Sequence, residues 1–339
     1  MIKIYTNKKF LNDSNRKRIF PLLFDMHYCQ NTKTLESFCF TDSLEDAAIA
    51  VFPIDIISYL REDNEQYFQF WINEVSKYKI EIWVYAAGDF GTDLKEEKIT
   101  TFRFGGYHSK MGLNTEVMPA FINDPYDEII TDDFFTLPKN LIPNIGFVGN
   151  ANGSLVKFAK EYFLYLRRNF RNWIGDVVED CHVFYPSSYK RFIVLQKMEK
   201  SKKLECNFIF RKKYRGLDKN AGTRKDSTIE FFNNIQSNLY VFCLRGNGNF
   251  SIRFYEALIM GRIPVLIDTD VRLPLSNEIN WSQHCLLVSE DSITEDLTKF
   301  HFSKTDAELK EIQLSNRKLM LEKLNRIYYF IHFKEKFKK

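Results

Sequence analysis

The sequence lacks several features that would assign it to a simple class. Its six cysteines include no C-x-x-C pair, so they offer neither a zinc site nor a redox motif. Its formal net charge is only +4 over 339 residues, which indicates no general affinity for nucleic acid. No apolar run is long enough to span a bilayer, and we find no internal repeat or low-complexity tract. We therefore expect a globular protein that binds neither a metal ion nor nucleic acid.

The start of the chain predicts no targeting segment. Residues 1–5 are followed by Lys8 and Lys9 before any long apolar run develops, which excludes the apolar core of a signal peptide and a membrane anchor. Cys39 and Cys243 lie within apolar runs, where a reduced thiol packs as a small hydrophobic group. These features predict a cytoplasmic protein.

The composition provides for two hydrophobic cores. Hydrophobic residues make up 45% of the chain, and its 339 residues are about twice the usual length of one domain. Short apolar runs, which suit strands buried on both faces of a parallel sheet, lie at residues 2–5, 47–52, 82–86, 145–148, 208–210, 239–244, 263–267 and 285–288. Helical patterns lie at residues 154–166, 251–260 and 305–333. This alternation predicts an α/β fold with right-handed crossovers.

Prolines predict the boundary between the two domains. Pro138 and Pro143 lie within residues 136–143, directly before a new strand with glycines at 145–149. We expect two sheet domains with a cleft between them. Their predicted bounds are residues 1–139 for the N-terminal domain, 140–304 for the C-terminal domain and 305–339 for a helical C-terminal segment.

The segment at residues 237–281 predicts a binding site for an anion. A buried strand is followed by a glycine loop at 245–249 and by a helix that begins near Ser251. Gly246 and Gly248 permit positive φ and let a ligand approach the backbone closely. The free N–H groups at the start of the helix point toward this loop, so an anion is its natural occupant.

Charged residues around this loop indicate which anion binds there. Arg253 and Glu256 share one face of the helix, where Arg253 would bind a diphosphate and Glu256 would accept hydrogen bonds from ribose or sugar hydroxyls. The alternative is an ordinary ion pair on a solvated helix face. Asp268 and Asp270 follow the next strand, at residues 263–267, and ligands in open α/β sheets bind at the carboxyl ends of strands. Two converging strand ends favour the binding site.

A basic cluster follows another expected strand of the same domain. Arg211, Lys212, Lys213 and Arg215 come directly after residues 208–210. A solvated surface run is one interpretation. A second diphosphate contact through Arg215 is the other.

The order of residues in the anion-binding segment resembles the exostosin family of glycosyltransferases. The resemblance rests on L-R-G at 244–246, S-I-R-F-Y-E-A-L at 251–258, G-R-I-P-V at 261–265, L-P-L at 273–275 and I-N-W at 279–281. Weaker similarities lie at 45–53, 83–91, 118–119 and 145–149. An ordered series of this kind is far more specific than a lone G-x-G.

The resemblance implies a GT-B fold, in which two Rossmann-like domains face each other across a cleft. It also implies an inverting transfer from a nucleoside-diphosphate sugar, usually a UDP-sugar, with no essential metal ion or other cofactor. Matched to the family's pattern, Arg253 and Glu256 lie on the donor-site helix, and Arg245 and Gly246 lie in the loop before it. The chain lacks the membrane anchor and the second glycosyltransferase domain of animal exostosins. It is more similar to a bacterial enzyme that builds a capsule, an O-antigen or another surface glycan.

An inverting transfer also needs a base near the acceptor hydroxyl, which the opposite domain normally supplies. Asp89 directly follows the strand at 82–86 and is the candidate base. Its rivals, each also consistent with a hydrogen-bonded turn residue, are Asp25, His27, His108 and Asp124. His182 and His284 have apolar neighbours and are expected to be structural.

The end of the chain interleaves aromatic and basic residues from Tyr328 to Lys339. This pattern suits an interfacial helix at the inner face of an anionic membrane, where a lipid-linked acceptor would be found. A packed C-terminal helix with a basic end is the other interpretation. No RNA-binding signature accompanies the pattern, so nucleic acid is not an expected partner.

Together these features predict an inverting glycosyltransferase that uses a nucleotide sugar and a glycan or lipid-linked acceptor. The alternative is a non-catalytic nucleotide- or glycan-binding protein of the same fold. The expected donor site consists of Arg215, Arg245, Gly246, Gly248, Ser251, Arg253, Glu256, Asp268 and Asp270.

Overall fold

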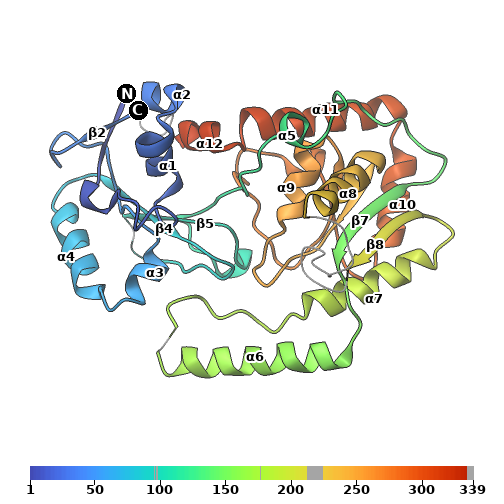
Figure 1. Ribbon diagram of the computed structural model, residues 1–339, viewed down its shortest axis with the longest axis horizontal. Helices are drawn as coiled ribbons and strands as arrows, with labels where there is room; N and C mark the ends of the chain where they lie inside the picture. Colours follow the sequence, from blue (N-terminus) through green and yellow to red (C-terminus); the bar gives the residue numbers. More distant parts are fainter. Residues whose placement is uncertain (95, 97, 176, 212–223, 334–339) are drawn as a thin grey trace.

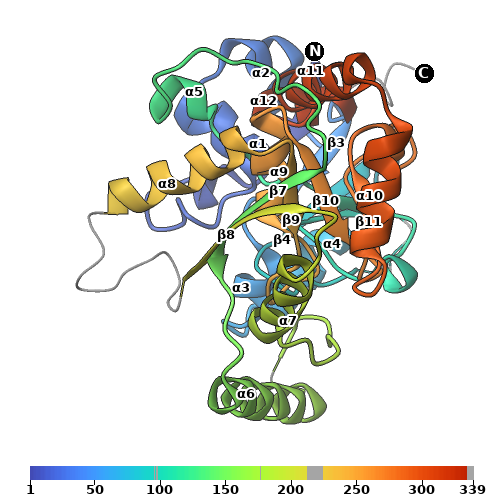
Figure 2. The same ribbon diagram turned by 90° about the vertical axis from the view of Figure 1, so that its right-hand side faces the viewer.

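Two α/β domains, each built on a parallel sheet, make up the computed structural model (Figures 1 and 2). The structure describes the chain except residues 95, 97, 176, 212–223 and 334–339. The two sheets occupy separate halves of the molecule and are joined by connections along one side (Figure 1). The prediction of a GT-B fold with two Rossmann-like domains is confirmed.

The N-terminal sheet has six strands in the order β2-β1-β3-β4-β5-β6, and every adjacent pair is parallel. The strands are β1 (Ile2–Tyr5), β2 (Phe38–Thr41), β3 (Ile49–Val51), β4 (Glu81–Ala86), β5 (Ile99–Arg103) and β6 (Thr115–Val117). The helices are η1 (Lys8–Phe10), α1 (Pro21–Phe24), η2 (Asp25–Cys29), α2 (Thr32–Ser37), α3 (Ile56–Leu60), α4 (Glu65–Ser76) and η3 (His108–Lys110). Strands β3 and β4 are almost entirely apolar because both faces of the sheet are covered.

The C-terminal sheet has five parallel strands in the order β11-β10-β9-β7-β8. The strands are β7 (Asn144–Asn150), β8 (Glu205–Arg211), β9 (Tyr240–Cys243), β10 (Ile263–Ile267) and β11 (Leu286–Val288). The helices from the connecting segment onward are α5 (Pro125–Glu128), α6 (Leu155–Trp173), α7 (Ser187–Glu199), α8 (Arg224–Ser237), α9 (Ile252–Ile259), η5 (Trp281–Gln283), α10 (Ile293–Ser303) and α11 (Asp306–Glu322).

Each apolar run that was predicted as a strand overlaps one. Three strands, β2, β5 and β6, were not predicted. β2 and β6 are short edge strands with partly exposed residues, and the apolar run of β2 at residues 38–40 is shorter than those of most of the predicted strands. β5 lies inside the sheet but carries Thr100, Thr101 and Arg103, so the sequence shows no apolar run that would predict this strand.

Helix α9 forms where the pattern predicted it and ends at Gly261. The φ angle of Gly261 is +65°, a left-handed conformation that suits the residue after a helix. A Cβ at this position would also lie 2.5 Å from the ring of Phe134. Glycine therefore both ends the helix and lets the connecting segment pack against it.

The predicted boundary at residues 136–143 runs along the C-terminal domain. The backbone N–H of Leu137 donates to Oε1 of Gln313 at 2.7 Å, and the Leu137 carbonyl accepts from Nε2 of Gln313 at 2.9 Å. Arg262 is fully buried and donates to the carbonyl of Phe135 at 3.0 Å. The connection is thus held by side chains of the C-terminal domain before β7 begins at Asn144.

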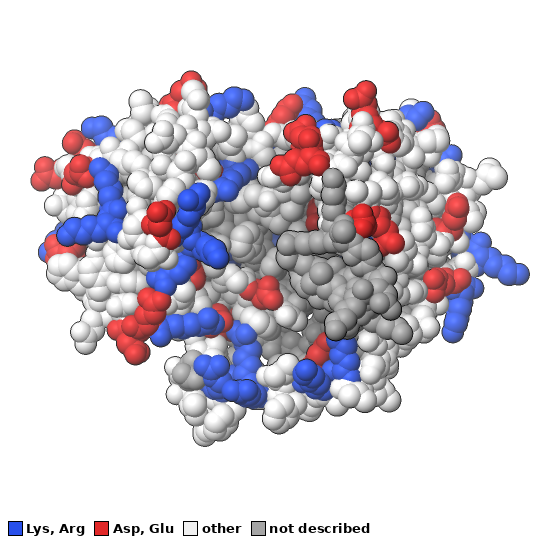
Figure 3. Space-filling view, in the orientation of Figure 1, with Lys and Arg blue, Asp and Glu red and all other residues white. Residues whose placement is uncertain are grey.

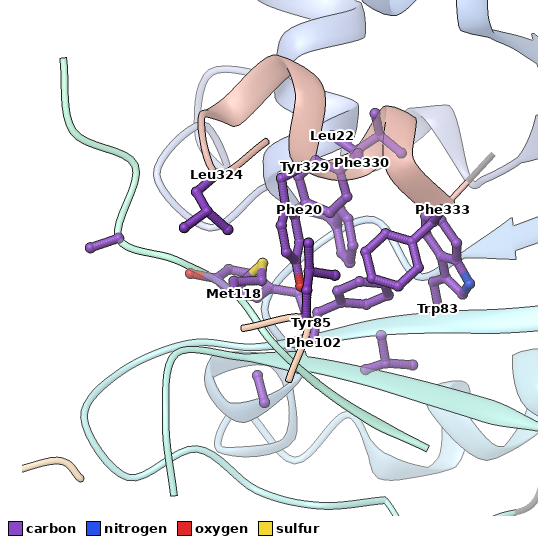
Figure 4. Close-up of a cluster of buried hydrophobic side chains, with 14 of the residues drawn as sticks. Phe20, Leu22, Trp83, Tyr85, Phe102, Met118, Leu324, Tyr329, Phe330 and Phe333 are labelled. Carbon is purple, nitrogen blue, oxygen red and sulfur yellow. The ribbon is translucent and has the colours of Figure 1, made fainter. Parts of the chain in front are cut away.

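The last helix, α12 (Arg326–Phe333), completes the core of the N-terminal domain (Figure 4). The rings of Phe330 and Phe333 lie 5.8 and 5.4 Å from that of Phe102 on β5. The hydroxyl of Tyr329 donates to the Val117 carbonyl at 2.9 Å. These three rings of α12 are buried, whereas the ring of Tyr328 is partly exposed.

This packing changes two expectations about the end of the chain. Helix α11 packs against α9 of the C-terminal domain, whereas α12 crosses to the N-terminal domain, so residues 305–333 serve both domains. Tyr329, Phe330 and Phe333 of the predicted membrane-binding tail are packed inside the protein, so these rings are not available to a bilayer. Residues 334–339 of the tail lie outside the described residues.

Candidate functional site

The glycine loop lies between β9 and α9, as predicted, but the reason for its glycines differs. Neither Gly246 nor Gly248 has a positive φ, so that expectation is wrong. A Cβ on Gly248 would lie 2.0 Å from the backbone carbonyl oxygen of Asp89 in the opposite domain. Gly248 is therefore required for the close approach of the two domains. At Gly246 an added Cβ would meet open space.

Arg245 is buried, and its guanidinium joins the two domains. It donates to the Tyr107 hydroxyl of the N-terminal domain at 2.9 Å and to the Asn247 carbonyl at 2.9 Å. A third contact reaches Nδ1 of His182 at 3.3 Å. Its charge thus lies at the junction of the domains, on the cleft side of the loop.

Arg253 projects from the first turn of α9 toward the end of β7. Its Nη2 donates to the Val148 carbonyl at 2.6 Å, and the guanidinium lies 4.3 Å from the centre of the Phe147 ring. Within the described part of the chain, its buried Nε has no hydrogen-bond partner. Burial lowers the pKa of Arg253, although Cys243 and Glu256 oppose the shift.

Glu256 lies one turn further along α9 and is partly buried. Among the described residues no ion pair joins it to Arg253, so the ordinary surface ion pair does not form. Burial raises the pKa of Glu256 to about 7, and the charge of Arg253 opposes this rise. Because its oxygens have no hydrogen-bond partner among the described residues, this partly buried carboxyl group is available to a ligand.

Arg191, on α7, is a member of the site that was not predicted from the sequence. It donates to the Asn150 carbonyl at the end of β7 at 3.1 Å and to the Arg245 carbonyl at 2.7 Å. Burial lowers its pKa to about 10, and the positive charge of Arg253 adds to the effect. We call Arg191, Arg245 and Arg253 the arginine cluster. It concentrates positive charge where β7 and β9 end.

The two aspartates after β10 are engaged in backbone contacts. Oδ1 of Asp268 accepts from the backbone N–H of Asp270 at 2.9 Å, which closes a turn. The Asp270 carboxylate accepts from the backbone N–H of Ser109 at 3.1 Å, and its carbonyl accepts from His108 at 2.8 Å. Asp268 thus stabilises the turn after β10, and Asp270 links this turn to the N-terminal domain, while their role in donor binding stays a prediction.

Asp89, the predicted base, lies in an exposed turn beside Gly248. The structure thus brings it across the cleft to the glycine loop. Two rivals have structural partners instead. Asp25 is buried and pairs with Arg326 at 2.7 Å, and Asp124 accepts two hydrogen bonds from Arg317, at 3.1 and 2.6 Å.

The histidines considered from the sequence differ in their surroundings. His27 and His108 are exposed, and Nδ1 of His108 accepts from Arg272 at 3.1 Å. His284 contacts Asn316 at 2.9 Å, which agrees with a structural role. Only His182 lies against the arginine cluster among these candidates.

His182 lines a cavity of about 610 Å³ between the domains, which extends from Phe90 and Asn247 to helix α6. Because a guanidinium can only donate, Nδ1 accepts from Arg245 and the imidazole proton lies on Nε2. Burial lowers the pKa of His182 to about 3, and the charge of Arg245 contributes. The ring is thus neutral, with a buried Nε2 that has no partner among the described residues. Figure 3 shows the surface hollowed between the two domains.

Arg215 lies outside the described residues. Arg211, at the start of the same basic cluster, pairs with Glu230 and donates to the Ser227 carbonyl at 2.8 Å. No group of three His, Cys, Asp or Glu side chains suited to a metal ion is present in the described residues. In the same part of the chain, no helix is both long and apolar enough to cross a membrane.

Comparison with known proteins gives a family match in the C-terminal domain. Residues 189–301 match the exostosin GT47 domain, which confirms the resemblance seen in the sequence. The rice protein "Probable glucuronosyltransferase GUT1" (Oryza sativa subsp. japonica) is 32% identical over 68 residues, and a second probable glucuronosyltransferase of rice matches equally. The match covers 20% of this chain and 16% of each rice protein, so the chain matches less than a fifth of their length.

Solved structures with a similar arrangement include glycosyltransferases. One from Rickettsia africae ESF-5 is 9% identical with a TM-score of 0.36, and the match covers 100% of this chain and 99% of that one. TarM is 10% identical with a TM-score of 0.35, and the match covers 87% of this chain and 55% of TarM.

Proposed function

We propose that this chain, whose residues 189–301 match the exostosin GT47 domain, is an inverting glycosyltransferase. Its donor is a nucleoside-diphosphate sugar, for which we propose a UDP-sugar. Its acceptor is a glycan or a lipid-linked oligosaccharide in the synthesis of a surface polysaccharide. Since the matched rice proteins are named probable glucuronosyltransferases, UDP-glucuronic acid is the first donor to test.

The observation that carries this proposal is the arginine cluster together with Glu256. Arg191 and Arg253 bind the last carbonyls of β7, and Arg191 also binds the Arg245 carbonyl at the end of β9. Such a concentration of buried positive charge favours a bound dianion, because a dianion would offset the mutual repulsion of the guanidinium groups. Glu256 is the carboxylate next to the cluster that has no hydrogen bond in the described residues, and it would accept those of ribose or sugar hydroxyls.

The arrangement supports catalysis by stabilisation of the departing nucleoside diphosphate. The acceptor oxygen attacks the anomeric carbon while the bond from that carbon to the diphosphate oxygen breaks, and the electron pair leaves with the nucleoside diphosphate. Arg191 and Arg253 would stabilise the negative charge that develops there. We propose that they do so without a metal ion or another cofactor. The acceptor hydroxyl loses its proton to a base from the N-terminal side, for which Asp89 remains the candidate.

The cavity beside the glycine loop suits the acceptor. Phe90, Asn247 and His182 line its inner end, so it opens from the proposed donor site toward α6. Aromatic and polar side chains together suit a sugar, whose ring has apolar faces and polar edges. We propose a cytoplasmic location, which the six free cysteines support because thiols persist in reducing compartments.

Binding of UDP to Arg253→Ala tests the donor site. Removal of a charge-assisted contact to a phosphate costs about 1.5–3 kcal/mol, so the dissociation constant for UDP should rise roughly 10- to 100-fold. Isothermal titration calorimetry measures this change, with GDP and CMP as competing nucleotides. Arg16→Ala, which changes an exposed arginine of the N-terminal domain, is the matched control and should bind UDP as the wild type does.

Turnover decides between an enzyme and a binding protein. Hydrolysis of UDP-sugars, or their transfer to added glycans, should be lost in Arg253→Ala and in Glu256→Ala while circular dichroism shows a folded protein. Retained transfer in both variants contradicts the assigned site. Tight UDP binding by a wild type that turns over no donor would favour the non-catalytic alternative.

A further inference from the structure

Helix α6 (Leu155–Trp173) differs from every other long helix described in the chain. It has 19 residues, none of which is buried. In both ribbon views it lies at the edge of the molecule, set apart from the two sheets (Figures 1 and 2). The sequence predicted a helix here from apolar residues at helical spacing, but the structure leaves most of these residues in solvent.

The exposed apolar residues form one continuous stripe along α6. Leu155, Ala159, Phe163, Leu166, Phe170 and Trp173 follow one another at intervals of three or four residues, which places them on one face of the helix. Phe163 is 66% exposed, Phe170 is 58% exposed and Trp173 is 81% exposed. A helix of this length extends about 28 Å. Monomeric proteins seldom leave an apolar surface of this length uncovered.

The face of α6 that adjoins one side of this stripe holds the helix to the rest of the protein. The rings of Phe158, Tyr162 and Tyr165 all contact the ring of Phe184, with centroids 5.0 to 5.4 Å apart. Nη2 of Arg168 lies 3.4 Å from Oε1 of Glu179. The helix is therefore anchored by these side chains, and its apolar stripe remains in solvent.

Charges on α6 are distributed unequally. Its sequence contains five basic residues and a single acidic one, Glu161. Lys160 and Arg167 are exposed and lie along one margin of the apolar stripe, whereas Glu161 lies on the inner half of the helix. Figure 3 shows Lys and Arg atoms gathered along the lower edge of the molecule, where α6 lies.

We infer that α6 is an interfacial helix that docks the protein on an anionic lipid membrane. The stripe around Phe163, Phe170 and Trp173 enters the boundary between headgroups and acyl chains, and Lys160 and Arg167 contact lipid phosphates. An apolar face with aromatic residues, bordered by cations, matches the chemistry of such a surface. The projecting position of α6 lets its outer face lie flat on a bilayer.

Docking through α6 would also place the outer end of the cavity next to the membrane. Leu164 and Tyr165 line the outer end of the cavity that reaches His182 and Asn247. An acceptor held in the membrane by a lipid would thus enter the cleft beside the docked helix. This second step rests on the proposed function, whereas membrane binding by α6 does not.

Flotation of the full chain with lipid vesicles tests the docking. The probes are vesicles of phosphatidylcholine alone and of phosphatidylcholine mixed with phosphatidylglycerol. We expect binding to the anionic vesicles, and a loss of at least about 100-fold in the partition coefficient for the triple variant Phe163→Ser, Phe170→Ser and Trp173→Ser. Serine has nearly the helix propensity of the residues it replaces, and the three side chains are exposed, so the fold should persist.

The control is Phe70→Ser, which changes an exposed phenylalanine on α4 and should bind vesicles as the wild type does. Lys160→Gln and Arg167→Gln should each weaken binding to anionic vesicles roughly fivefold at low salt. Failure of the wild type to bind anionic vesicles, or unchanged binding by the triple variant, overturns the inference. A dimer in sedimentation that the triple variant converts to a monomer also overturns it, because a second copy would then cover the stripe.

Turnover of a soluble acceptor separates this inference from the proposed function. The triple variant does not alter the donor site, so it should retain wild-type hydrolysis of the donor while losing vesicle binding. If the wild type does not hydrolyse the donor, only the proposed function is contradicted. If the wild type does not bind anionic vesicles, only the role of α6 is contradicted.

Discussion

Replacement of Glu256 by glutamine separates the effect of this carboxylate on protein stability from its role in donor binding. Burial raises the pKa of Glu256 from 4.5 to about 7, so the native protein holds the proton more tightly than the unfolded chain. The ionised side chain therefore destabilises the fold above pH 7, and this cost disappears as the pH falls through 7 to 4.5. The shift in pKa corresponds to at most about 3 kcal/mol.

Glu256 is partly exposed, so water reduces this cost. We expect Glu256→Gln to add about 2 kcal/mol to the free energy of unfolding at about pH 8. The same change removes a charged acceptor for the donor's hydroxyls, and donor turnover should fall roughly tenfold or more. The variant is thus expected to be more stable and less active, which is the behaviour of a residue retained for function.

Urea unfolding followed by circular dichroism, at about pH 8 and about pH 5, measures the effect. The gain in stability should be present at the higher pH and largely lost at the lower one. Glu311→Gln, at an exposed position on α11, should change neither value. Equal stability of Glu256→Gln and the wild type at about pH 8 would refute the argument from burial, and wild-type turnover would refute the role in donor binding.

Two substitutions test the packing. Gly248→Ala should separate the domains, because its Cβ would lie 2.0 Å from the Asp89 carbonyl oxygen, and X-ray scattering should show a larger radius of gyration, whereas Gly246→Ala meets open space and keeps the wild-type value. Phe330→Ala should lower the free energy of unfolding by about 3–5 kcal/mol because the ring is fully buried, and Phe302→Ala, which is exposed, should change it by less than about 0.5 kcal/mol. A wild-type scattering profile of Gly248→Ala would contradict the close contact between the domains at this glycine. A wild-type urea midpoint of Phe330→Ala would contradict the role of this ring in the core.

Local pattern was sufficient for the elements that are buried on both faces. Residues 263–267 form β10 with the bounds expected, and residues 82–86 form most of β4, because such strands need uninterrupted apolar side chains. Helix α9 and its end at Gly261 were also readable, since they depend on neighbours within the same segment. The family resemblance depended on the same contiguous segment, and the match at residues 189–301 confirmed it.

The candidate site was predictable only in part. Arg253 and Glu256 were identified because they share one helix, whereas Arg191 comes from a different helix and reaches β7 and β9 only in the folded chain. Asp268 lay at a strand end as expected, but its hydrogen bonds close a turn. A sequence shows where a carboxylate lies along the chain, whereas its hydrogen-bond partners depend on the tertiary structure.

Two amphipathic helices, α6 and α12, show the same difference between what the sequence determines and what the fold decides. The sequence by itself determined that α6 and α12 are helices with an apolar face, because helical spacing is a local property. Only the tertiary structure decided that the face of α12 fills the core beside Phe102, whereas the stripe of α6 remains in solvent. The physical reason is that the hydrophobic effect requires an apolar face to be covered but is not directional, so the covering surface depends on how distant segments meet.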